Sequence, residues 1–237
     1  MYLVTAKEMQ EIDRQAIESF GIPGAVLMEN AAKGAVQTLL SRIDSKNKNI
    51  KKIAVLAGPG NNGGDGLVMA RYLLEKGFTI NVFLFSSKEK LKGNAAANLR
   101  LFETLCIHSD KGTLTEIQNQ KEFNHYKLQI LHHELFVDAL LGTGLNAEVR
   151  GIIKSAIELI NDSLKPVFSV DIPSGLSADT GQTLGAAVKA FATATFAFAK
   201  LGHILYPGNA LSGDVEIIDI GIPQYIAKEK NISIFIP

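Results

Sequence analysis

Residues 53–77 read IAVLAGPGNNGGDGLVMARYLLEKG, and this stretch decides the fold. Residues 53–57 form a short apolar run that stops at Gly58, as a buried strand of a parallel sheet does. From Leu67 onward the apolar residues recur at helical spacing, and Gly77 stands where a glycine ends many helices. The stretch therefore predicts a strand, a glycine-rich loop and a helix.

Five glycines dominate the predicted loop. They stand at positions 58, 60, 63, 64 and 66. Because glycine has no Cβ atom, we expect the backbone here to turn with positive φ and to approach a ligand closely. The free N–H groups at the start of the following helix favour an anion. The loop thus predicts a site for an anionic ligand.

Neither familiar phosphate-binding motif fits the loop completely. Residues 58–63 match the G-x-G-x-x-G dinucleotide fingerprint, which also needs an acidic residue about 20 positions further on. The next predicted strand, 78–85, instead ends in Ser-Ser-Lys at 86–88. The P-loop motif needs a lysine where Gly64 stands.

Two amides and a carboxylate also stand in the loop, at Asn61, Asn62 and Asp65. Their oxygen atoms are hydrogen-bond acceptors, whereas a pyrophosphate needs donors, so a loop built only for pyrophosphate has no use for Asp65. The simpler alternative is a tight turn in which these side chains only cap the helix. The loop by itself leaves both interpretations open.

The composition indicates a soluble, cytoplasmic protein with a single domain over residues 1–237. The chain has 237 residues, 46% of them apolar, which suffices for one large α/β core. Its 24 basic and 24 acidic residues cancel, which excludes a global basic field for nucleic acid. Cys106 is the only cysteine, so no intramolecular disulfide forms, and a reducing compartment suits the chain. The N-terminus lacks a signal-peptide core, and no window reaches the ~18 apolar residues of a membrane span.

Two helices are expected before the glycine-rich unit. Thr5 and Glu8 have the spacing of a capping box, and apolar residues follow at helical spacing as far as Phe20. A second helix is expected from near Pro23 to about Ile43, with small residues along one face. Small residues allow close packing, so we expect this pair of helices across the sheet or in a contact between two copies of the chain.

Strand and helix signals alternate along the rest of the chain. Strands are expected at residues 135–141, 167–172, 192–199 and 215–222, and helices at about 93–105 and 149–161. This alternation predicts a parallel, doubly wound sheet. Residues 106–134 give only weak signals, and the histidines in this segment are expected to be solvated because zinc spacing is absent.

Two carboxylates stand inside strongly apolar strands. Asp138 lies in FVDAL and Asp171 in SVDIP. A buried carboxylate is costly unless it is hydrogen-bonded, paired or bound to a metal. Because the carboxyl ends of parallel strands meet at one edge of the sheet, we expect both near Asp65 and Lys200. Such a set offers carboxylate acid–base chemistry or cation binding.

Several short motifs follow one another along the chain in a fixed order. They are NNGGDG at 61–66, VDALLGTG at 137–144, and DIPSGL at 171–176 with DTG at 179–181. Further matches are LMENAA at 27–32, GNA at 93–95 and the tail at 213–223. Together they resemble the NAD(P)H-hydrate epimerases, the YjeF N-terminal family. The resemblance implies a Rossmann-like three-layer α/β/α sandwich with a mainly parallel sheet, assembled as a homodimer.

The resemblance also implies a metabolite-repair activity. Hydrated NADH and NADPH (NADHX and NADPHX) carry a hydroxyl on C6 of the nicotinamide ring and exist as R and S epimers. The family interconverts the epimers, so that a dehydratase that accepts only the S epimer can clear both. Since the chain ends soon after its last predicted strand, the dehydratase is expected as a separate polypeptide or as a removed segment.

Roles for individual residues follow from the same resemblance. Asp171 is expected at the reactive ring, where it would protonate the departing hydroxyl and deprotonate the incoming water. Lys200 is the second candidate for proton transfer. One potassium ion per subunit is expected on Asn62, Asp138 and Ser174. The residues expected to bind the dinucleotide are Asn61, Asn62, Gly63, Gly64, Asp65, Gly142, Thr143, Gly144, Leu145, Asn146, Ala147, Glu148 and Asp171.

The chain departs from the family pattern in two places. Residues 146–149 stand where the family usually has a polar segment that contains a proline, so the dinucleotide contacts expected there are less firmly implied. Asn94 stands where the family usually has an aspartate. The sequence does not set the preference between NADHX and NADPHX. Lys88 could meet a 2′-phosphate, but an exposed loop lysine needs no such explanation.

Other functions remain as alternatives. A non-catalytic nucleotide- or protein-binding module on the same fold is expected to lose the acidic site residues, which this chain keeps. A conventional NAD-dependent oxidoreductase needs the acidic residue that is missing after the second strand. A serine nucleophile has little support, because Ser174 lies outside a G-x-S-x-G motif and no spacing ties His203 to it.

Overall fold

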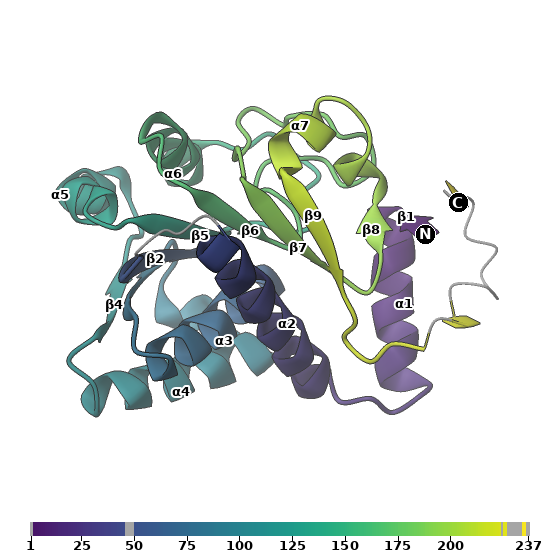
Figure 1. The fold of residues 1–237 in the computed structure, drawn as a ribbon, viewed down its shortest axis with the longest axis horizontal. Helices are drawn as coiled ribbons and strands as arrows, with labels where there is room; N and C mark the ends of the chain where they lie inside the picture. The colour runs from purple at the N-terminus through teal and green to yellow at the C-terminus, as the bar shows by residue number, and fades with distance from the viewer. Residues whose placement is uncertain (1, 46–49, 224, 227–233, 236–237) are drawn as a thin grey trace.

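A seven-stranded sheet forms the centre of the computed structural model, which describes residues 2–45, 50–223, 225–226 and 234–235 (Figure 1). The strands are β2 (Lys52–Ala57), β3 (Thr79–Leu84), β4 (Gly112–Glu116), β5 (Leu135–Ala139), β6 (Val167–Val170), β7 (Ala192–Phe196) and β9 (Asp214–Ile218). Their order is β4-β3-β2-β5-β6-β7-β9, and every neighbouring pair is parallel. The order reverses between β2 and β5, where ligands of such sheets bind.

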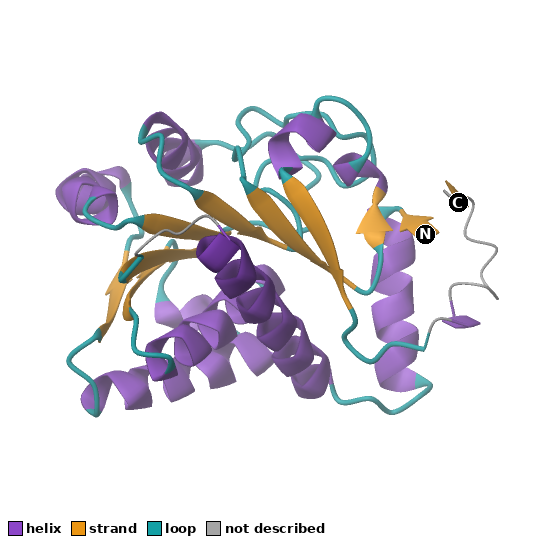
Figure 2. Cartoon of the chain, viewed as in Figure 1, coloured by secondary structure: helices purple, strands orange, loops and turns teal. Residues whose placement is uncertain are grey.

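Helices cover both faces of this sheet (Figure 2). One face carries α2 (Gly24–Ser45), α3 (Asn61–Glu75) and α4 (Gly93–Ile107), and the other carries α5 (Gln120–Leu131), α6 (Gly151–Asp162) and the short α7 (Gly208–Ser212). The buried apolar residues accordingly divide into two large clusters, one on each face. The three-layer sandwich with a parallel sheet, predicted from the sequence, is confirmed.

The first turns of α3 correct the prediction for the glycine-rich loop. The helix begins at Asn61 and not near Leu67, and none of the five glycines has a positive φ. A Cβ atom on Gly63 would lie 1.9 Å from the Gly58 carbonyl oxygen, and one on Gly66 would lie 2.6 Å from the Ala139 Cβ. Gly63 and Gly66 are required because the helix packs so closely against its neighbours, and not because the chain turns.

A second, three-stranded sheet was not expected. It joins β1 (Tyr2–Val4) to β8 (Ala199–Lys200) in parallel and to β10 (Ile234–Phe235) in antiparallel register. The strand expected over 192–199 ends at Phe196 because Ala197 has a φ of 58°, and the chain then leaves the central sheet. This turn brings Lys200 beside β1, next to the start of the first helix.

The helix α1 (Ala6–Glu18) follows β1 directly and stands at the end of the central sheet (Figure 1). Its capping box is confirmed, since Thr5 Oγ1 accepts the Glu8 N–H at 3.1 Å and the Glu8 carboxylate accepts the Thr5 N–H at 2.7 Å. The Ala6 N–H donates to the Asp179 carboxylate at 2.6 Å, which ties the start of the helix to the far part of the chain.

Residues 106–134 contain a strand and a helix, β4 and α5, with the 3₁₀ turn η1 (Lys88–Lys90) before them and η2 (Leu201–His203) later in the chain. The expectation of solvated histidines is wrong for His133. Its side chain is buried, with Nδ1 3.0 Å from the Ile130 carbonyl and Nε2 2.9 Å from Asn81 Oδ1. His133 is buried because it lies two residues before the buried strand β5.

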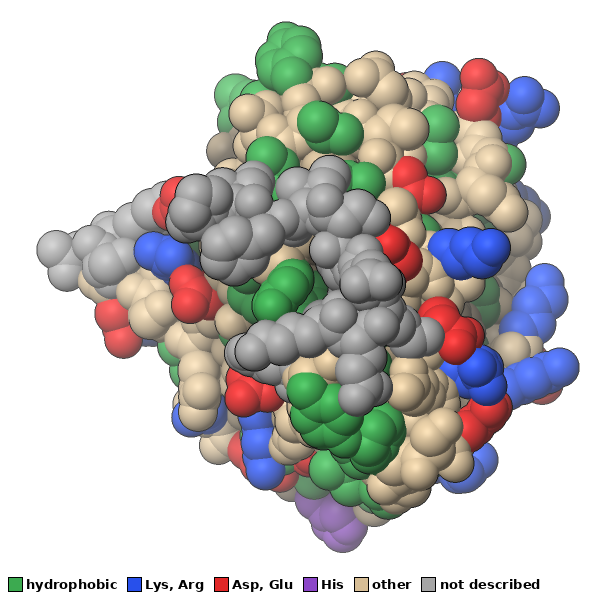
Figure 3. All heavy atoms as spheres, turned by 90° about the vertical axis from the view of Figure 1, so that its right-hand side faces the viewer, with side chains coloured by type: hydrophobic (Ala, Val, Ile, Leu, Met, Phe, Trp, Pro, Cys, Tyr) green, Lys and Arg blue, Asp and Glu red, His purple; other side chains and the backbone are tan. Residues whose placement is uncertain are grey.

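On the face that Figure 3 presents, acidic and basic side chains are interspersed and do not gather by sign. Lys88, the candidate partner of a 2′-phosphate, is already engaged, since its Nζ lies 2.6 Å from the Glu103 carboxylate. Among the residues described, no helix combines the length and the apolar character needed to cross a membrane.

Candidate functional site

A cavity of about 590 Å³ opens at the point where the strand order reverses. Its walls come from the start of α3, the loop after β5, the residue after β6, strand β8 and the helices α1 and α2. The predicted residues that line it are Asn61, Asn62, Asp65, Gly142, Thr143, Gly144, Leu145, Asn146, Asp171 and Lys200. Segments far apart in the sequence thus meet at one edge of the sheet, as the strand pattern predicted.

The other predicted residues lie outside the wall of the cavity. Gly63 and Gly64 are buried in the first turns of α3, and Ala147 and Glu148 are exposed, with Glu148 paired to Arg150 at 3.1 Å. Asp138 and Ser174 are fully buried behind the cavity.

The sequence reasoning missed one functional candidate, Asp13 of α1, which also lines the cavity. The only sequence signal was its position one turn from Met9 and Ala16, on the stripe of α1 that is otherwise apolar and buried. A carboxylate on such a stripe calls for an explanation.

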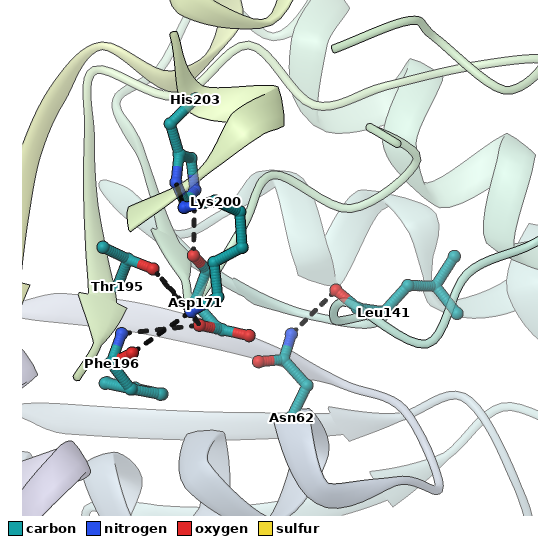
Figure 4. Close-up of polar contacts among 7 residues, drawn as sticks. All are labelled: Asn62, Leu141, Asp171, Thr195, Phe196, Lys200 and His203. Carbon is teal, nitrogen blue, oxygen red and sulfur yellow. Dashed lines mark hydrogen bonds and ion pairs between the residues drawn. The ribbon is translucent and has the colours of Figure 1, made fainter. Parts of the chain in front are cut away.

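Asp171 is held in an unusual backbone conformation. Its φ is 65°, in the left-handed region that a non-glycine residue enters only under constraint. The Asp171 N–H donates to the Ala194 carbonyl at 2.7 Å, and the Asp171 carbonyl lies 3.1 Å from His203 Nε2 (Figure 4). These contacts fix the backbone so that the carboxylate faces the cavity. Strain of this kind is concentrated at functional sites.

Lys200 holds one oxygen of that carboxylate. Its Nζ lies 2.6 Å from Asp171 Oδ1, 2.9 Å from Thr195 Oγ1 and 3.2 Å from the Phe196 carbonyl, and the lysine is only 1% exposed. The three N–H groups of the ammonium are therefore all engaged. Among the described residues, no hydrogen bond reaches Asp171 Oδ2, so this oxygen is available to a ligand.

His203 supports the pair from behind. Its Nδ1 accepts the Lys200 N–H at 3.1 Å, which leaves the ring hydrogen on Nε2, where it donates to the Asp171 carbonyl. Burial and the Lys200 charge lower the pKa of His203 to about 4, so the ring is neutral at pH 7. The sequence prediction that His203 serves no serine nucleophile agrees with this arrangement, because both ring nitrogens are committed to the backbone.

Two further carboxyl groups face the cavity without a cation of their own. Asp65 is 8% exposed and lacks a hydrogen bond within the described residues. Burial, together with the charges of Asp171 and Asp13, raises the pKa of Asp65 well above its usual 3.8. Burial also raises the pKa of Asp13 to about 6, against the lowering effect of Lys200. Burial thus raises the pKa of both carboxyl groups above the usual range of an aspartate.

Oxygen atoms gather around Asp138 behind the cavity. The carboxylate accepts hydrogen bonds from Ser174 Oγ at 2.5 Å, from the Ser174 N–H at 2.9 Å and from Ser169 Oγ at 2.8 Å. Burial raises the pKa of Asp138, although the bonds from Ser174 oppose that rise. The carboxylate buried in FVDAL is thus compensated, as the sequence argument required.

Asn62 connects this cluster to the cavity. Its Nδ2 donates to the Leu141 carbonyl at 2.8 Å (Figure 4). Ser174 Oγ lies 3.1 Å from the same oxygen. Asn62 Oδ1 is buried and has no hydrogen-bond partner among the described residues. An unpartnered amide oxygen beside carbonyl, hydroxyl and carboxylate oxygens is the kind of ligand set that hard cations take. The residues present therefore fit the expected potassium ion.

The fold and this cavity define a Rossmann-like α/β protein with a polar, acidic ligand site at the carboxyl ends of its parallel strands. Residues 24–202 match the family of YjeF-related protein N-termini, and the chain belongs to that family. The yeast protein ynu0, solved by crystallography, has the same fold, with a TM-score of 0.80 and 24% sequence identity over 100% of this chain and 96% of that one.

The sequence relatives are of two kinds. A bifunctional NAD(P)H-hydrate repair enzyme of Moorella thermoacetica is 38% identical over 98% of this chain, which spans 43% of that protein. The NAD(P)H-hydrate epimerase of Oenococcus oeni is 36% identical over 92% of this chain and 96% of its own length. That of Elusimicrobium minutum is 35% identical over 94% of this chain and 97% of its own length. The chain thus spans less than half of the bifunctional relative but nearly all of the two epimerases.

Proposed function

We propose that this chain is an NAD(P)H-hydrate epimerase, which interconverts the R and S epimers of NADHX and NADPHX at C6 of the nicotinamide ring. The observation that carries the proposal is the Asp171 carboxylate, held by strained backbone with one oxygen bound to Lys200 and the other free toward the cavity. The names of the relatives that match along their whole length support the reaction.

The chemistry needs one carbon to lose and regain a hydroxyl group. The ring nitrogen of the hydrate can push out the C6 hydroxyl as water once that hydroxyl is protonated, leaving a planar iminium that water attacks from either face. A carboxyl group that gives a proton and then takes one serves both half-reactions. Asp171 has the exposure to the cavity that this role requires.

Lys200 is assigned a supporting role in this proposal. Because its three N–H groups are taken by Asp171, Thr195 and the Phe196 carbonyl, it has no proton in position for the substrate. Instead it fixes the orientation of the carboxylate and stabilises the ionised form after the proton has been given. His203 holds the backbone of both residues and stays neutral.

The dinucleotide would bind along the start of α3 and the loop after β5. Asn61 and Asn62, in the first turn of α3, line the cavity, and the free N–H groups of a helix's first turn suit a phosphate. A potassium ion held by Asn62, Asp138 and Ser174, with the Leu141 carbonyl beside them, would supply fixed positive charge next to the anionic substrate. These assignments extend the expectations from the sequence.

Coupling to a dehydratase is part of the proposal. The bifunctional relatives join a segment similar to this chain to a longer protein named for repair of NAD(P)H hydrates. An epimerase alone clears no hydrate, so a dehydratase specific for one epimer must consume the product. Assembly as a homodimer is proposed on the family resemblance alone, and a cytoplasmic location on the composition of the chain.

The test uses pure R-NADPHX and follows the appearance of the S epimer by chromatography, with the spontaneous rate subtracted. We expect acceleration by the wild-type protein and a loss of at least about 100-fold in kcat for Asp171→Asn, because general acid–base groups contribute 10²–10⁴-fold. Binding of the dinucleotide, measured by calorimetry, should persist in this variant.

Asp162→Asn serves as the matched control, since it removes an exposed carboxylate at the end of α6. Near-wild-type kcat in Asp171→Asn would remove that residue from the mechanism. A wild-type protein that binds the dinucleotide and never accelerates the interconversion would instead favour the binding-module alternative.

A further inference from the structure

Asp13 is fixed in the cavity by a rigid part of the fold. It stands on α1, which is anchored at its start by the capping box and by the bond from the Ala6 N–H to Asp179. The strand before this helix pairs with β8, the strand that carries Lys200. The helix that carries Asp13 is therefore connected through β1 to the strand that carries Lys200. Figure 1 shows α1 beside β1 and β8.

The balance of charge in the cavity leaves Asp13 without a fixed counter-ion. The charged groups that act on it come from three other segments: Asp65 of α3, Asp171 after β6 and Lys200 of β8. The Lys200 ammonium is already saturated by Asp171, Thr195 and a carbonyl. Asp13 makes no hydrogen bond or ion pair within the described part of the chain, so its carboxyl group is available to a ligand in the cavity.

Asp65 gives an independent sign that the cavity is built for a polar ligand on this side. Asp65 as a residue is more than nine-tenths buried, lines the cavity and lacks a hydrogen-bond partner among the described residues. A buried polar group without a partner costs stability unless a ligand or water completes it. Asp13 and Asp65 therefore add two acidic groups to the cavity, on helices α1 and α3, which do not carry Asp171 or Lys200.

The proposed reaction needs proton transfer on two sides of a planar ring. When the R epimer becomes S, water leaves from one face of C6 and another water adds from the opposite face. Asp171 alone can serve both faces only if it moves between them, yet its backbone and one carboxylate oxygen are held, which favours one face over the other. A second group on a separate element supplies the other.

We propose that Asp13 is a second catalytic acid–base residue, serving the face of the nicotinamide ring opposite to the face that Asp171 serves. This proposal rests on the epimerase function proposed above. In one direction, protonated Asp171 gives its proton to the C6 hydroxyl, the C–O bond breaks, water leaves and the ring nitrogen lone pair forms the C=N bond.

Water then adds to C6 from the other face, a new C–O bond forms and the C=N electron pair returns to nitrogen. Ionised Asp13 takes the released proton, so atoms and charge balance. The reverse direction starts from protonated Asp13 and ionised Asp171. Proton exchange with solvent or with Asp65 resets the pair after each turnover.

The test compares Asp13→Asn with wild type on R-NADPHX and on S-NADPHX, with the spontaneous rate subtracted at each pH. We expect kcat to fall by 100-fold or more in both directions, with KM changed less than threefold and a melting temperature no lower than that of the wild type, because burial of the ionised Asp13 is itself unfavourable near neutral pH. Asp13→Glu should recover part of kcat, because it restores a carboxyl group on the same helix. Glu18→Gln is the control, since it removes an exposed carboxylate from the last turn of α1.

The pH profile separates catalysis from a structural role. Wild-type kcat/KM should fall as the pH rises through about 6, where Asp13 loses the proton that the pair shares. That limb should vanish in Asp13→Asn and return in Asp13→Glu. An active wild type whose Asp13→Asn variant keeps its kcat and its pH profile would overturn the role of Asp13 alone. A wild type that is inactive on both epimers would overturn the epimerase function first, and this proposal with it.

Discussion

Asp65 carries a cost to stability at the scale of a single residue. Its carboxyl group is buried without a partner among the described residues, and its pKa in the folded protein is well above 3.8. A carboxyl whose folded pKa is raised favours folding at low pH, and that advantage is lost as the pH rises toward the folded pKa. At pH 8 Asp65 ionises readily in the unfolded state, whereas burial makes its ionisation unfavourable in the folded state.

We therefore predict that Asp65→Asn stabilises the protein, and more at pH 8 than at pH 5. A tenfold change in an ionisation constant corresponds to about 1.4 kcal/mol, so the gain at pH 8 should reach at least about 1 kcal/mol. Urea unfolding at both pH values measures it. The exposed Asp110→Asn is the control and should change nothing. Equal stability of Asp65→Asn and wild type at pH 8 would mean that a partner already compensates the carboxylate.

The residues of the site were predictable to different degrees. Asp138 and Asp171 could be found because each interrupts a strongly apolar strand. Asp13 could not, because it follows no motif and its helix is short and otherwise ordinary. Its importance arises from tertiary structure, when α1 stands against the carboxyl ends of strands that come much later in the chain.

Among the elements, α3 shows how a correct motif led to a wrong conformation. Strand, glycines and helix were all expected, but Gly63, Gly64 and Gly66 belong to the first turns of the helix. A glycine in a positive-φ turn and one in a crowded helix look the same in the sequence. The strand expected over 192–199 failed for a related reason, since a single residue, Ala197, turns the chain out of the sheet. Strand periodicity contains no information about such a turn.

The packing of α3 predicts the effect of a single added methyl group. Alanine is a better helix former than glycine by about 1 kcal/mol, so propensity alone predicts that Gly63→Ala stabilises the protein. A Cβ atom there would lie 1.9 Å from the Gly58 carbonyl oxygen, and the helix would have to move. We predict a loss of about 1–3 kcal/mol in the free energy of unfolding, measured in urea.

Gly144→Ala is the matched control for this prediction. A Cβ atom on Gly144 meets nothing within 4 Å, so its stability should change by less than about 0.5 kcal/mol. If Gly63→Ala were as stable as wild type, the close approach of α3 to the loop after β2 would not be a feature of the folded protein.

At the scale of the whole molecule, the site depends on long-range connections that hydrophobic patterning cannot reveal. The central sheet follows from alternating strand and helix signals, and its switch point between β2 and β5 places the cavity. The small sheet of β1, β8 and β10 joins segments near the two ends of the described chain, with only two or three residues in each strand. Strands that short give no readable period, although they position α1 and Lys200 together.

The potassium site gives a prediction about the stability of the whole fold. Asn62, Asp138 and Ser174 belong to three different segments, and Asn62 Oδ1 lacks a partner among the residues described. An ion that binds there only in the folded protein stabilises it by mass action, by about 2.7 kcal/mol at one hundred times its Kd. We expect a melting temperature several degrees higher in 100 mM KCl than in choline chloride of the same ionic strength, because a domain of this size shifts by about 2–4 °C per kcal/mol.

Asn62→Ala should abolish the difference between the two salts, whereas Asn209→Ala, at an exposed position, should keep it. The comparison of salts matters more than the melting temperature itself, since Asn62 also donates to the Leu141 carbonyl and its loss lowers stability in any buffer. Equal melting temperatures of the wild type in potassium and in choline would leave Asn62 Oδ1 to a water molecule or to the substrate. The fold would then need no cation to hold its three segments together.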